Sequence, residues 1–488
     1  MKKVLLTILD GFGISNSNNN LIDNTSMPNY KNIKDKYPCA SLNASGSAIG
    51  YYDNVRGCNT IGHMTIGAGR VIKRKLLQVE ELFKEDVLEN NNNYQEMVNY
   101  VIDKDVPLHI MIMLSDGGIH SHIDVLLNMM EKLHEKHIEN LYFHIISDGI
   151  DTKKSIIEFV NILNDKIRLF KMGSIASVCG RYYAMDRDSN YSRTKIYTDL
   201  VTLGKGKYCE NLNNVLNFYK NNEITDDKIP PLLVNRKGLI KDGHVLLCLN
   251  YRRDRIAQTL NALTNFKFNY YDTIKMDNLK TYTIYNYPEA KKSKYFLDDL
   301  KIHNTISTYL SDLGMSQARI TRLETLADVT YFFDGGRDVK LDNCVNIYEK
   351  YTDDLDKNMP CVLITKDAIK CMEDDYDFIL VNLSCADLAS NTNDINKIKR
   401  TLEVMDICVG KLFDEAQDNF YTLMITSSHG NLEDMDVVGN TLNKVPFIIC
   451  DDKVKLSNGE LSNIAPTILD YMDIRIPGEM ESDSLLKK

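Results

Sequence analysis

The chain has 488 residues and a mass of 55.8 kDa, which at about 150 residues per domain predicts two to four domains and excludes a peptide or a single small binding module. Its 43% hydrophobic and 26% charged residues are typical of a globular protein and exclude a disordered chain. The formal net charge of −10 repels polyanions, so we expect neither nucleic acid nor an anionic membrane as a partner. A small anion is compatible with this charge where arginines cluster.

The cysteines and the apolar segments predict a cytoplasmic protein. The eleven cysteines are odd in number and never form a C-x-x-C pair, which favours buried free thiols in a reducing compartment and argues against a zinc cluster. The apolar run 4–9 is ended by Asp10 before a signal-peptide core could form, so it is predicted to be a buried first strand. No apolar stretch approaches the roughly 18–20 residues of a membrane-spanning helix.

Short apolar segments alternate along the chain with longer segments of helical periodicity. The predicted strands, in chain order, are 108–114, 141–146, 244–250, 376–383, 421–426 and 445–450. Apolar residues at three- and four-residue spacing predict amphipathic helices over 123–133 and 395–413. This alternation is typical of βαβ units and predicts an α/β fold with largely parallel sheets.

Two polar stretches are the predicted domain boundaries. One follows Gly69 and Arg70, and the other is the lysine-rich segment 287–294. Linkers of this composition predict an inserted domain over residues 72–302 and an outer domain formed by residues 1–71 and 303–488. The sequence therefore predicts one α/β domain inserted into another.

Four polar, glycine-containing clusters follow predicted strands. They are residues 10–13, 115–122, 148–151 and 427–430. Ligands bind at the carboxyl ends of the strands in open α/β sheets, so the four clusters together are a candidate site. Each cluster alone is weak evidence, because a polar turn with glycine also ends an ordinary strand.

Arginines gather in two further segments. The four of interest are Arg181, Arg187, Arg252 and Arg255. Guanidinium groups at strand ends suit the bidentate binding of phosphate or carboxylate. The alternative is that they form structural ion pairs with the neighbouring aspartates Asp186, Asp188 and Asp254.

The run G-C-N-T-I-G-H-M-T-I-G-A-G-R over residues 57–70, with the clusters above and the nine residues from Gly180, closely resembles the cofactor-independent phosphoglycerate mutases. The resemblance covers nearly the whole chain in the right order. It implies the alkaline phosphatase superfamily fold, with a metal-bearing phosphatase-like domain built from both ends and an inserted transferase-like domain that binds phosphoglycerate. It also implies the conversion of 3-phosphoglycerate to 2-phosphoglycerate in glycolysis.

Asn59 stands at the position of the family nucleophile. In the family, a serine within G-N-S-E-V-G-H is phosphorylated by the substrate, and two manganese ions activate it. Aligning on Gly62 and His63 places Asn59 there, and an amide is not a useful phosphoryl acceptor. Thr60 or Cys58 could substitute only with a register shift, and a one-residue step in an extended segment points the side chain to the opposite face.

The resemblance also implies incomplete metal sites. Three residues match family ligands: Asp10, His429 and Asp387. The other four of the seven ligand positions are substituted, by Asn59, Ser428, Asn391 and Asn440. Neutral amides and hydroxyls are poor manganese ligands, so we expect manganese binding to be weak or absent.

The substrate-binding positions depart less from the family. Six of eight match: His120, Asp151, Arg181, Arg187, Arg252 and Arg255. Ile150 replaces the arginine of the family's D-G-R-D motif, and Thr325 replaces the lysine of E-T-E-K. Charge-assisted bonds are worth ~1.5–3 kcal/mol each, so losing two predicts phosphoglycerate binding weaker by roughly two to four orders of magnitude.

These substitutions predict a phosphoglycerate mutase-like pseudoenzyme with little or no activity, which retains a weak site for phosphoglycerate or a similar small anion. The alternative is an active, rewired mutase or phosphatase. It would use Thr60 or another nucleophile, with one residual metal near Asp10 and His429. The sequence identifies no protein partner.

Overall fold

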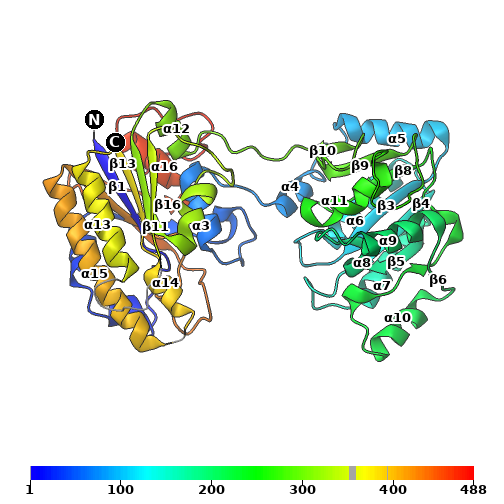
Figure 1. Ribbon diagram of the computed structural model, residues 1–488, viewed down its shortest axis with the longest axis horizontal. Coiled ribbons are helices and arrows are strands. Elements are labelled where there is room, and N and C mark those ends of the chain that lie inside the picture. The colour runs from blue at the N-terminus through cyan, green and yellow to red at the C-terminus, as the bar shows by residue number, and fades with distance from the viewer. Residues whose placement is uncertain (1, 351–358, 393, 488) are drawn as a thin grey trace. The chain divides into compact units, whose positions relative to one another are not determined.

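The chain forms two compact units in a computed structural model that describes residues 2–350, 359–392 and 394–487. Unit 1 consists of Met1–Lys73 and Lys301–Lys488, and unit 2 consists of Arg74–Leu300. Each unit has its own eight-stranded sheet (Figure 1). Unit 2 is two residues shorter at each end than the insert expected from the sequence. The α/β class predicted from the alternation of elements is confirmed.

The sheet of unit 1 is built around its first strand. The strand order is β12-β11-β13-β1-β14-β15-β2-β16. The strands are β1 (Lys3–Ile8), β2 (Cys39–Asn43), β11 (Gln317–Arg322), β12 (Cys344–Glu349), β13 (Phe378–Asn382), β14 (Tyr421–Thr426), β15 (Val445–Ile449) and β16 (Gly459–Glu460). β1 is parallel to both of its neighbours, β13 and β14. Their carboxyl ends therefore lie at one edge of the sheet.

Helices cover both faces of this sheet. They are α1 (Leu21–Asn24), α2 (Pro28–Lys36), α3 (Asn59–Ala68), α12 (Ile306–Asp312), α13 (Pro360–Glu373), α14 (Cys385–Ser390), α15 (Ile395–Asp418) and α16 (Ile464–Tyr471). Because side chains alternate along a strand, Leu5 packs in one core with α13 and α15, whereas Val4 and Leu6 pack in another with α16. Short 3-10 helices span Gly46–Ile49, Leu323–Thr325 and Leu461–Asn463, and a π-helix spans Asp328–Phe332.

Unit 2 is also built around an eight-stranded sheet with helices on both faces. Its strand order is β10-β9-β8-β3-β4-β5-β7-β6. The strands are β3 (Leu108–Leu114), β4 (Leu141–Ser147), β5 (Ser174–Gly180), β6 (Lys207–Tyr208), β7 (Leu232–Leu233), β8 (Val245–Cys248), β9 (Lys280–Tyr285) and β10 (Lys294–Leu297). Every residue of β3 is buried, as expected of a parallel strand with helices on both faces.

The helices of unit 2 also form two layers. They are α4 (Lys75–Glu81), α5 (Asn92–Lys104), α6 (Ile123–Glu135), α7 (Ile156–Phe170), α8 (Arg181–Ala184), α9 (Tyr191–Leu203), α10 (Leu212–Asn221) and α11 (Arg253–Thr264), with 3-10 helices at Asp226–Lys228 and Arg236–Gly238. Residues of α5, α6 and α7 pack in one core, and residues of α9 and α11 pack in the other. None of the described helices combines the length and the apolar character that crossing a membrane requires.

All eleven cysteines lie in the described part of the chain, and none forms a disulfide there. Seven of them are buried, as the sequence predicts for free thiols, but Cys39 is exposed. Burial raises the pKa of the buried Cys248 thiol to about 12, so this group is a hydrophobic core residue rather than a reactive thiolate.

Candidate functional site

The polar clusters of unit 1 meet where three neighbouring strands end. Asp10 lies two residues beyond β1, Ser428 lies two residues beyond β14, and Asn382 is the last residue of β13. Because these strands are adjacent and parallel, their side chains come together at one edge of the sheet. The three residues are fully buried.

Asp10 is the centre of this cluster, and its negative charge is compensated by His63. His63 Nε2 lies 3.1 Å from Asp10 Oδ1, Asn382 Nδ2 donates to Asp10 Oδ2 at 2.6 Å, and the Ser428 hydroxyl donates to Oδ1. Burial raises the pKa of Asp10, but the charges of His63 and His429 and the hydrogen bonds of His63 and Ser428 together outweigh burial and lower the pKa to about 2. Burial lowers the pKa of His63, but Asp10 raises it overall. The two side chains therefore form a buried ion pair.

The helix that carries His63 also carries the residue at the nucleophile position. α3 begins at Asn59, and a Cβ at Gly62 would lie 2.3 Å from the carbonyl oxygen of Ser428. Glycine at this position lets the helix lie directly against the loop after β14. The segment expected to be extended is thus helical, so Thr60 is turned by about 100° from Asn59 rather than to the opposite face of a strand.

Asn59 is engaged with the histidine that matches a family metal ligand. Its amide oxygen contacts His429 Nε2, and His429 Nε2 lies 3.8 Å from Asp387 Oδ2. Asp387 in turn accepts a hydrogen bond from Asn431 Nδ2 at 2.8 Å. Burial raises the pKa of Asp387, and the charge of Asp10 raises it further. The structure thus brings Asp10, His429 and Asp387 into one buried cluster.

Of the four substituted metal positions, three form hydrogen bonds within the protein and one is exposed. Asn440 Nδ2 donates to the carbonyl oxygen of Gly57 at 2.8 Å, and Asn391 is exposed at the end of α14. Ser428 and Asn59 use their polar atoms on Asp10 and His429. Within residues 2–350, 359–392 and 394–487, no three His, Cys, Asp or Glu side chains are arranged to hold a metal ion. The side chains present do not fit a dinuclear manganese centre.

Sequence reasoning missed three buried residues of this cluster. His63 lies in the run that carries the resemblance and Asn382 ends a predicted strand, but nothing local marks either as a partner of Asp10. Asp328 begins the π-helix, and burial raises its pKa to about 6, with Asp10 adding to the shift. π-helical turns often occur at functional sites, but a single turn gives no reliable sequence signal.

The arginine cluster of unit 2 is also formed at the carboxyl ends of strands. β8, β3, β4 and β5 are neighbours in the sheet and run parallel. The loops and helix starts that follow them carry His120, Asp151, Arg181, Arg187, Arg252 and Arg255. The structure therefore brings all six sequence-predicted residues to one edge of this sheet.

Arg181 is buried between two carboxylates. Its Nη1 atom lies 2.5 Å from Asp148 Oδ1 and 2.9 Å from Asp151 Oδ2. Asp148 also accepts a hydrogen bond from the Ser115 hydroxyl at 2.6 Å. The positive charge of Arg181 is therefore compensated within the protein, by aspartates other than the three that the ion-pair alternative names.

Arg187 and Arg252 share Asp254, and Arg187 Nε also lies 4.0 Å from Asp188 Oδ1. Arg187 Nη1 donates to Asp254 Oδ2 at 3.1 Å, and Arg252 donates to both oxygens of Asp254 at 2.8 and 3.2 Å. Both arginine side chains are 45% exposed. Exposed ion pairs of this kind contribute at most about 1 kcal/mol to stability. An incoming anion can therefore replace Asp254 as the partner of these arginines.

Arg255 and His120 give the cluster unused hydrogen-bonding capacity. Arg255 Nε is buried without a hydrogen-bond partner, and so is His120 Nδ1. Burial lowers the pKa of Arg255, and the like charges of Arg187 and Arg181 lower it further. Burial and the charges of Arg181 and Arg252 lower the pKa of His120 to about 4, so His120 is neutral at pH 7. A buried guanidinium N–H without a partner is the feature expected of an anion site.

The two substituted positions have different surroundings. Ile150 is 65% exposed in the loop after β4. Thr325 is buried in unit 1, where its hydroxyl lies 2.8 Å from that of Thr321. Thr321 donates to Asn382 Oδ1 at 3.0 Å, so Thr325 belongs to the hydrogen-bonded cluster around Asp10.

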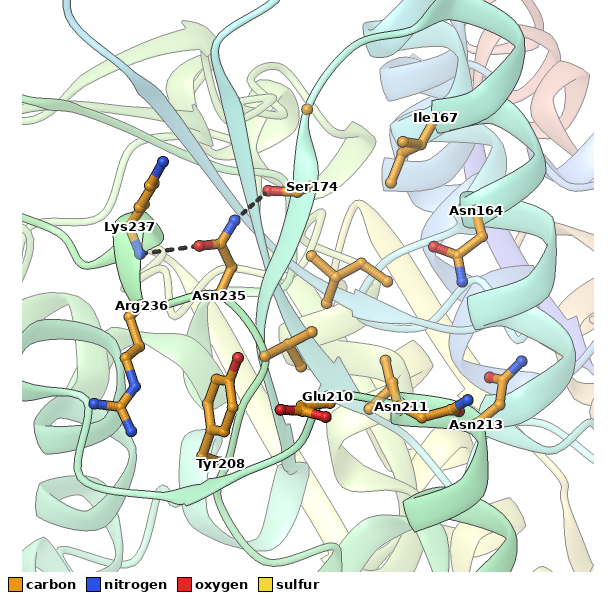
Figure 2. A pocket seen from close by; sticks show the side chains of 14 residues that line it. Asn164, Ile167, Ser174, Tyr208, Glu210, Asn211, Asn213, Asn235, Arg236 and Lys237 are labelled. Carbon is orange, nitrogen blue, oxygen red and sulfur yellow. Dashed lines mark hydrogen bonds between the residues drawn. The ribbon is translucent and has the colours of Figure 1, made fainter.

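A separate cavity of about 650 Å³ opens in unit 2 and contains none of these residues. Figure 2 shows Tyr208, Arg236 and Asn235 on one side and Asn164 of α7 on the other. The Arg236 guanidinium lies 4.9 Å from the centre of the Tyr208 ring. The cavity includes Ser174, the first residue of β5, so it lies at the opposite end of that strand from Arg181.

Comparisons with known proteins indicate one family. The family model "BPG-independent PGAM N-terminus" matches residues 79–289. The 2,3-bisphosphoglycerate-independent phosphoglycerate mutase of Clostridium acetobutylicum is 32% identical over 510 residues, covering 100% of this chain and 99% of the relative. That of Prochlorococcus marinus is 33% identical, covering 99% of this chain and 94% of the relative.

The comparison with solved structures also matches a phosphoglycerate mutase. A crystal structure of Leishmania mexicana phosphoglycerate mutase at low cobalt concentration matches with a TM-score of 0.62 and 22% identity, covering 100% of this chain and 98% of that one. The architecture is thus that of an α/β protein with a second α/β unit inserted. With relatives above 30% identity over their full length, the chain belongs to the 2,3-bisphosphoglycerate-independent phosphoglycerate mutase family, and the resemblance carried by residues 57–70 is confirmed.

Proposed function

We propose that the chain is a phosphoglycerate mutase-family protein with little or no mutase activity, which retains a weak site for phosphoglycerate or a similar small anion. The observation that carries this proposal is Asn59 at the nucleophile position, with its amide oxygen against His429. An amide has no hydroxyl to accept a phosphoryl group. Thr60 is an unsuitable substitute because the helical turn directs it away from Asn59.

The same proposal extends to the two units and their ligands. Unit 1 is the metal-type domain, in which Asp10, His429 and Asp387 are the residual ligands, and unit 2 is the substrate-type domain. Cobalt in the crystals of the Leishmania relative supports metal dependence in the family. In this chain the buried Asp10–His63 ion pair and the hydrogen bonds of Asn59 and Ser428 occupy the groups that a metal would need, so manganese binding is weak or absent.

The cytoplasm is the compartment that this proposal implies. The eleven free cysteines support it, because unpaired thiols persist in reducing compartments. The anion site is assigned to unit 2 and to its six residues, of which Arg255 has unused hydrogen-bonding capacity.

A manganese titration tests the metal part of the proposal. Free Mn²⁺ is followed by electron paramagnetic resonance as protein is added, beside an active relative. We expect an affinity more than about 100-fold below that of the relative, because losing direct ligands costs more than losing their supporting hydrogen bonds. The double variant Asn59→Ser, Ser428→Asp restores two ligands and is expected to bind Mn²⁺ more tightly than the natural chain. Two tightly bound equivalents in the natural chain would contradict the proposal.

A further inference from the structure

The sheet of unit 1 ends in a strand whose outer edge pairs with no described strand. β12 is the first strand in the sheet order, and its neighbour on the inner side is β11. It has six residues, whereas β16 at the opposite edge of the sheet has two. Val345 and Tyr348 of β12 are 36% and 44% exposed. An exposed edge strand of this length is a template for pairing with another chain.

The hydrogen bonds to β11 determine which residues of β12 face outward. The backbone N–H of Gln317 donates to the carbonyl oxygen of Asn343 at 2.8 Å, and the register pairs Gln317 with Cys344. Because the bonds of a parallel ladder alternate along each strand, every second residue of β12 points its N–H and C=O away from β11. These residues are Cys344, Asn346 and Tyr348. No hydrogen bond to their outward backbone groups is formed by the described part of the chain.

A second copy of the same strand fits this edge in one register. Two-fold symmetry uses the same surface on both copies, so the two strands run antiparallel. Outward-facing residues must then oppose outward-facing residues, which places the symmetry axis at a residue. An axis at Asn346 or at Ile347 pairs five of the six strand residues. The first places Asp342 opposite Lys350, whereas the second places Lys350 opposite Cys344.

The register centred on Asn346 is complementary in charge. Asp342 and Lys350 are both exposed, and by symmetry they form two ion pairs between the copies. Asn343 lies opposite Glu349, so no like charges meet there. The other cross-strand pairs are Val345 with Ile347, Cys344 with Tyr348, and Asn346 with its symmetry mate. Apolar and opposite-charge pairs of this kind stabilise an antiparallel strand pair.

We propose that the outer edge of β12 is the interface of a homodimer, in which two copies of the chain pair antiparallel about a two-fold axis at Asn346. The sheets of the two copies of unit 1 then become continuous. A single strand pair is small for a protein interface, so the association is weak and reversible. The inference is independent of the anion site and of the metal positions.

Analytical ultracentrifugation of the full chain tests this proposal. We expect the weight-average mass to rise from 55.8 kDa towards twice that value between about 1 and 200 µM, as a small interface requires. Asn346→Pro removes the backbone N–H at the axis. That N–H faces away from β11, a position at which an edge strand accepts proline, so the variant is expected to fold and to stay monomeric. A mass of 55.8 kDa for the natural chain throughout this range would overturn the proposal.

Charge reversal tests the register without altering the backbone. Lys350→Glu places two carboxylates opposite each other at both ends of the interface, and it is expected to weaken the dimer by about tenfold. Adding Asp342→Lys restores opposite charges and is expected to recover the association. Lys453→Glu changes the net charge equally in the exposed loop before β16, and it is expected to leave the dimer unchanged. A dimer that is insensitive to Lys350→Glu, or is not recovered in the double variant, would overturn this interface.

Discussion

Arg319→Met is expected to lower the free energy of unfolding by about 3–5 kcal/mol, because it leaves a buried carboxylate without its counter-ion. Arg319 lies in β11 and donates two hydrogen bonds of 2.8 Å to the two oxygens of Asp334. Both side chains are at most 3% exposed. Burial raises the pKa of Asp334, and Arg319 opposes this shift. Urea unfolding followed by circular dichroism measures the loss.

Two control variants separate the ion pair from simple truncation. The double variant Arg319→Met, Asp334→Leu removes both charges and is expected to recover most of the loss, since a buried pair can often be replaced by apolar residues. Arg168→Met breaks a pair with Asp165 whose side chains are 75% and 69% exposed, and it is expected to change stability by less than about 1 kcal/mol. A double variant as unstable as Arg319→Met would show that the cavity, not the charge, dominates.

Acid is expected to destabilise unit 2 through a chain of three histidines. His109 Nδ1 lies 3.0 Å from His144 Nε2, and His109 Nε2 lies 2.8 Å from His244 Nδ1. The chain ends at Ser177, whose Oγ lies 2.9 Å from His144 Nδ1. The three rings are stacked across neighbouring strands, with centroids 5.0 and 5.3 Å apart.

The sign of the effect follows from the direction of the pKa shifts. Burial lowers the pKa of His144 to about 3, burial and the two neighbouring histidines lower that of His109, and burial and Lys241 lower that of His244. Protonation therefore favours the unfolded chain. The stability is fully present above the unfolded pKa of about 6.5 and falls as the pH drops towards 3, by roughly 2 kcal/mol at pH 5 from His144 alone.

Urea unfolding at pH 7.5 and pH 5 measures this loss. His144→Gln removes one titrating group, so the difference in unfolding free energy between the two pH values is expected to shrink, whatever the stability of the variant at pH 7.5. His137→Gln is the matched control, because His137 is exposed and its variant is expected to keep the full difference. A pH difference that is unchanged in His144→Gln would contradict this account.

The fold was largely predictable because its strands are buried on both faces. The apolar run 376–383 predicts a strand, and the structure forms one at Phe378–Asn382. Apolar residues at helical spacing over 395–413 likewise predict a helix, which the structure extends to Asp418. In both segments the local pattern and the tertiary packing favour the same structure.

The start of α3 was not predictable from local preferences. Its sequence contains Gly62 and Gly67, and glycine costs a helix about 1 kcal/mol relative to alanine. A Cβ at Gly67 would lie 2.1 Å from the carbonyl oxygen of Phe333, so close packing requires glycine and tertiary contacts stabilise the helix. That packing is formed with residues far away in the sequence.

In the candidate site, too, local sequence predicts some features and contacts between distant residues decide the others. The polar clusters after the strands identify Asp10 and His429, because strand ends are recognisable in the sequence. The pairing of Asp10 with His63, 53 residues away, and with Asn382, 372 residues away, depends on the order of strands in the sheet. The buried location of Thr325 beside Thr321 depends on the same order.

An enolase-coupled mutase assay tests the central claim most directly. The substrate is 3-phosphoglycerate in excess Mn²⁺, and an active family member and an Arg181→Ala variant are measured in parallel. Losing a nucleophile costs about 10⁶ in turnover, so the account predicts no turnover above background for this chain. Turnover near that of the active relative, abolished in Arg181→Ala, would contradict it and show that a residue other than Asn59 accepts the phosphoryl group.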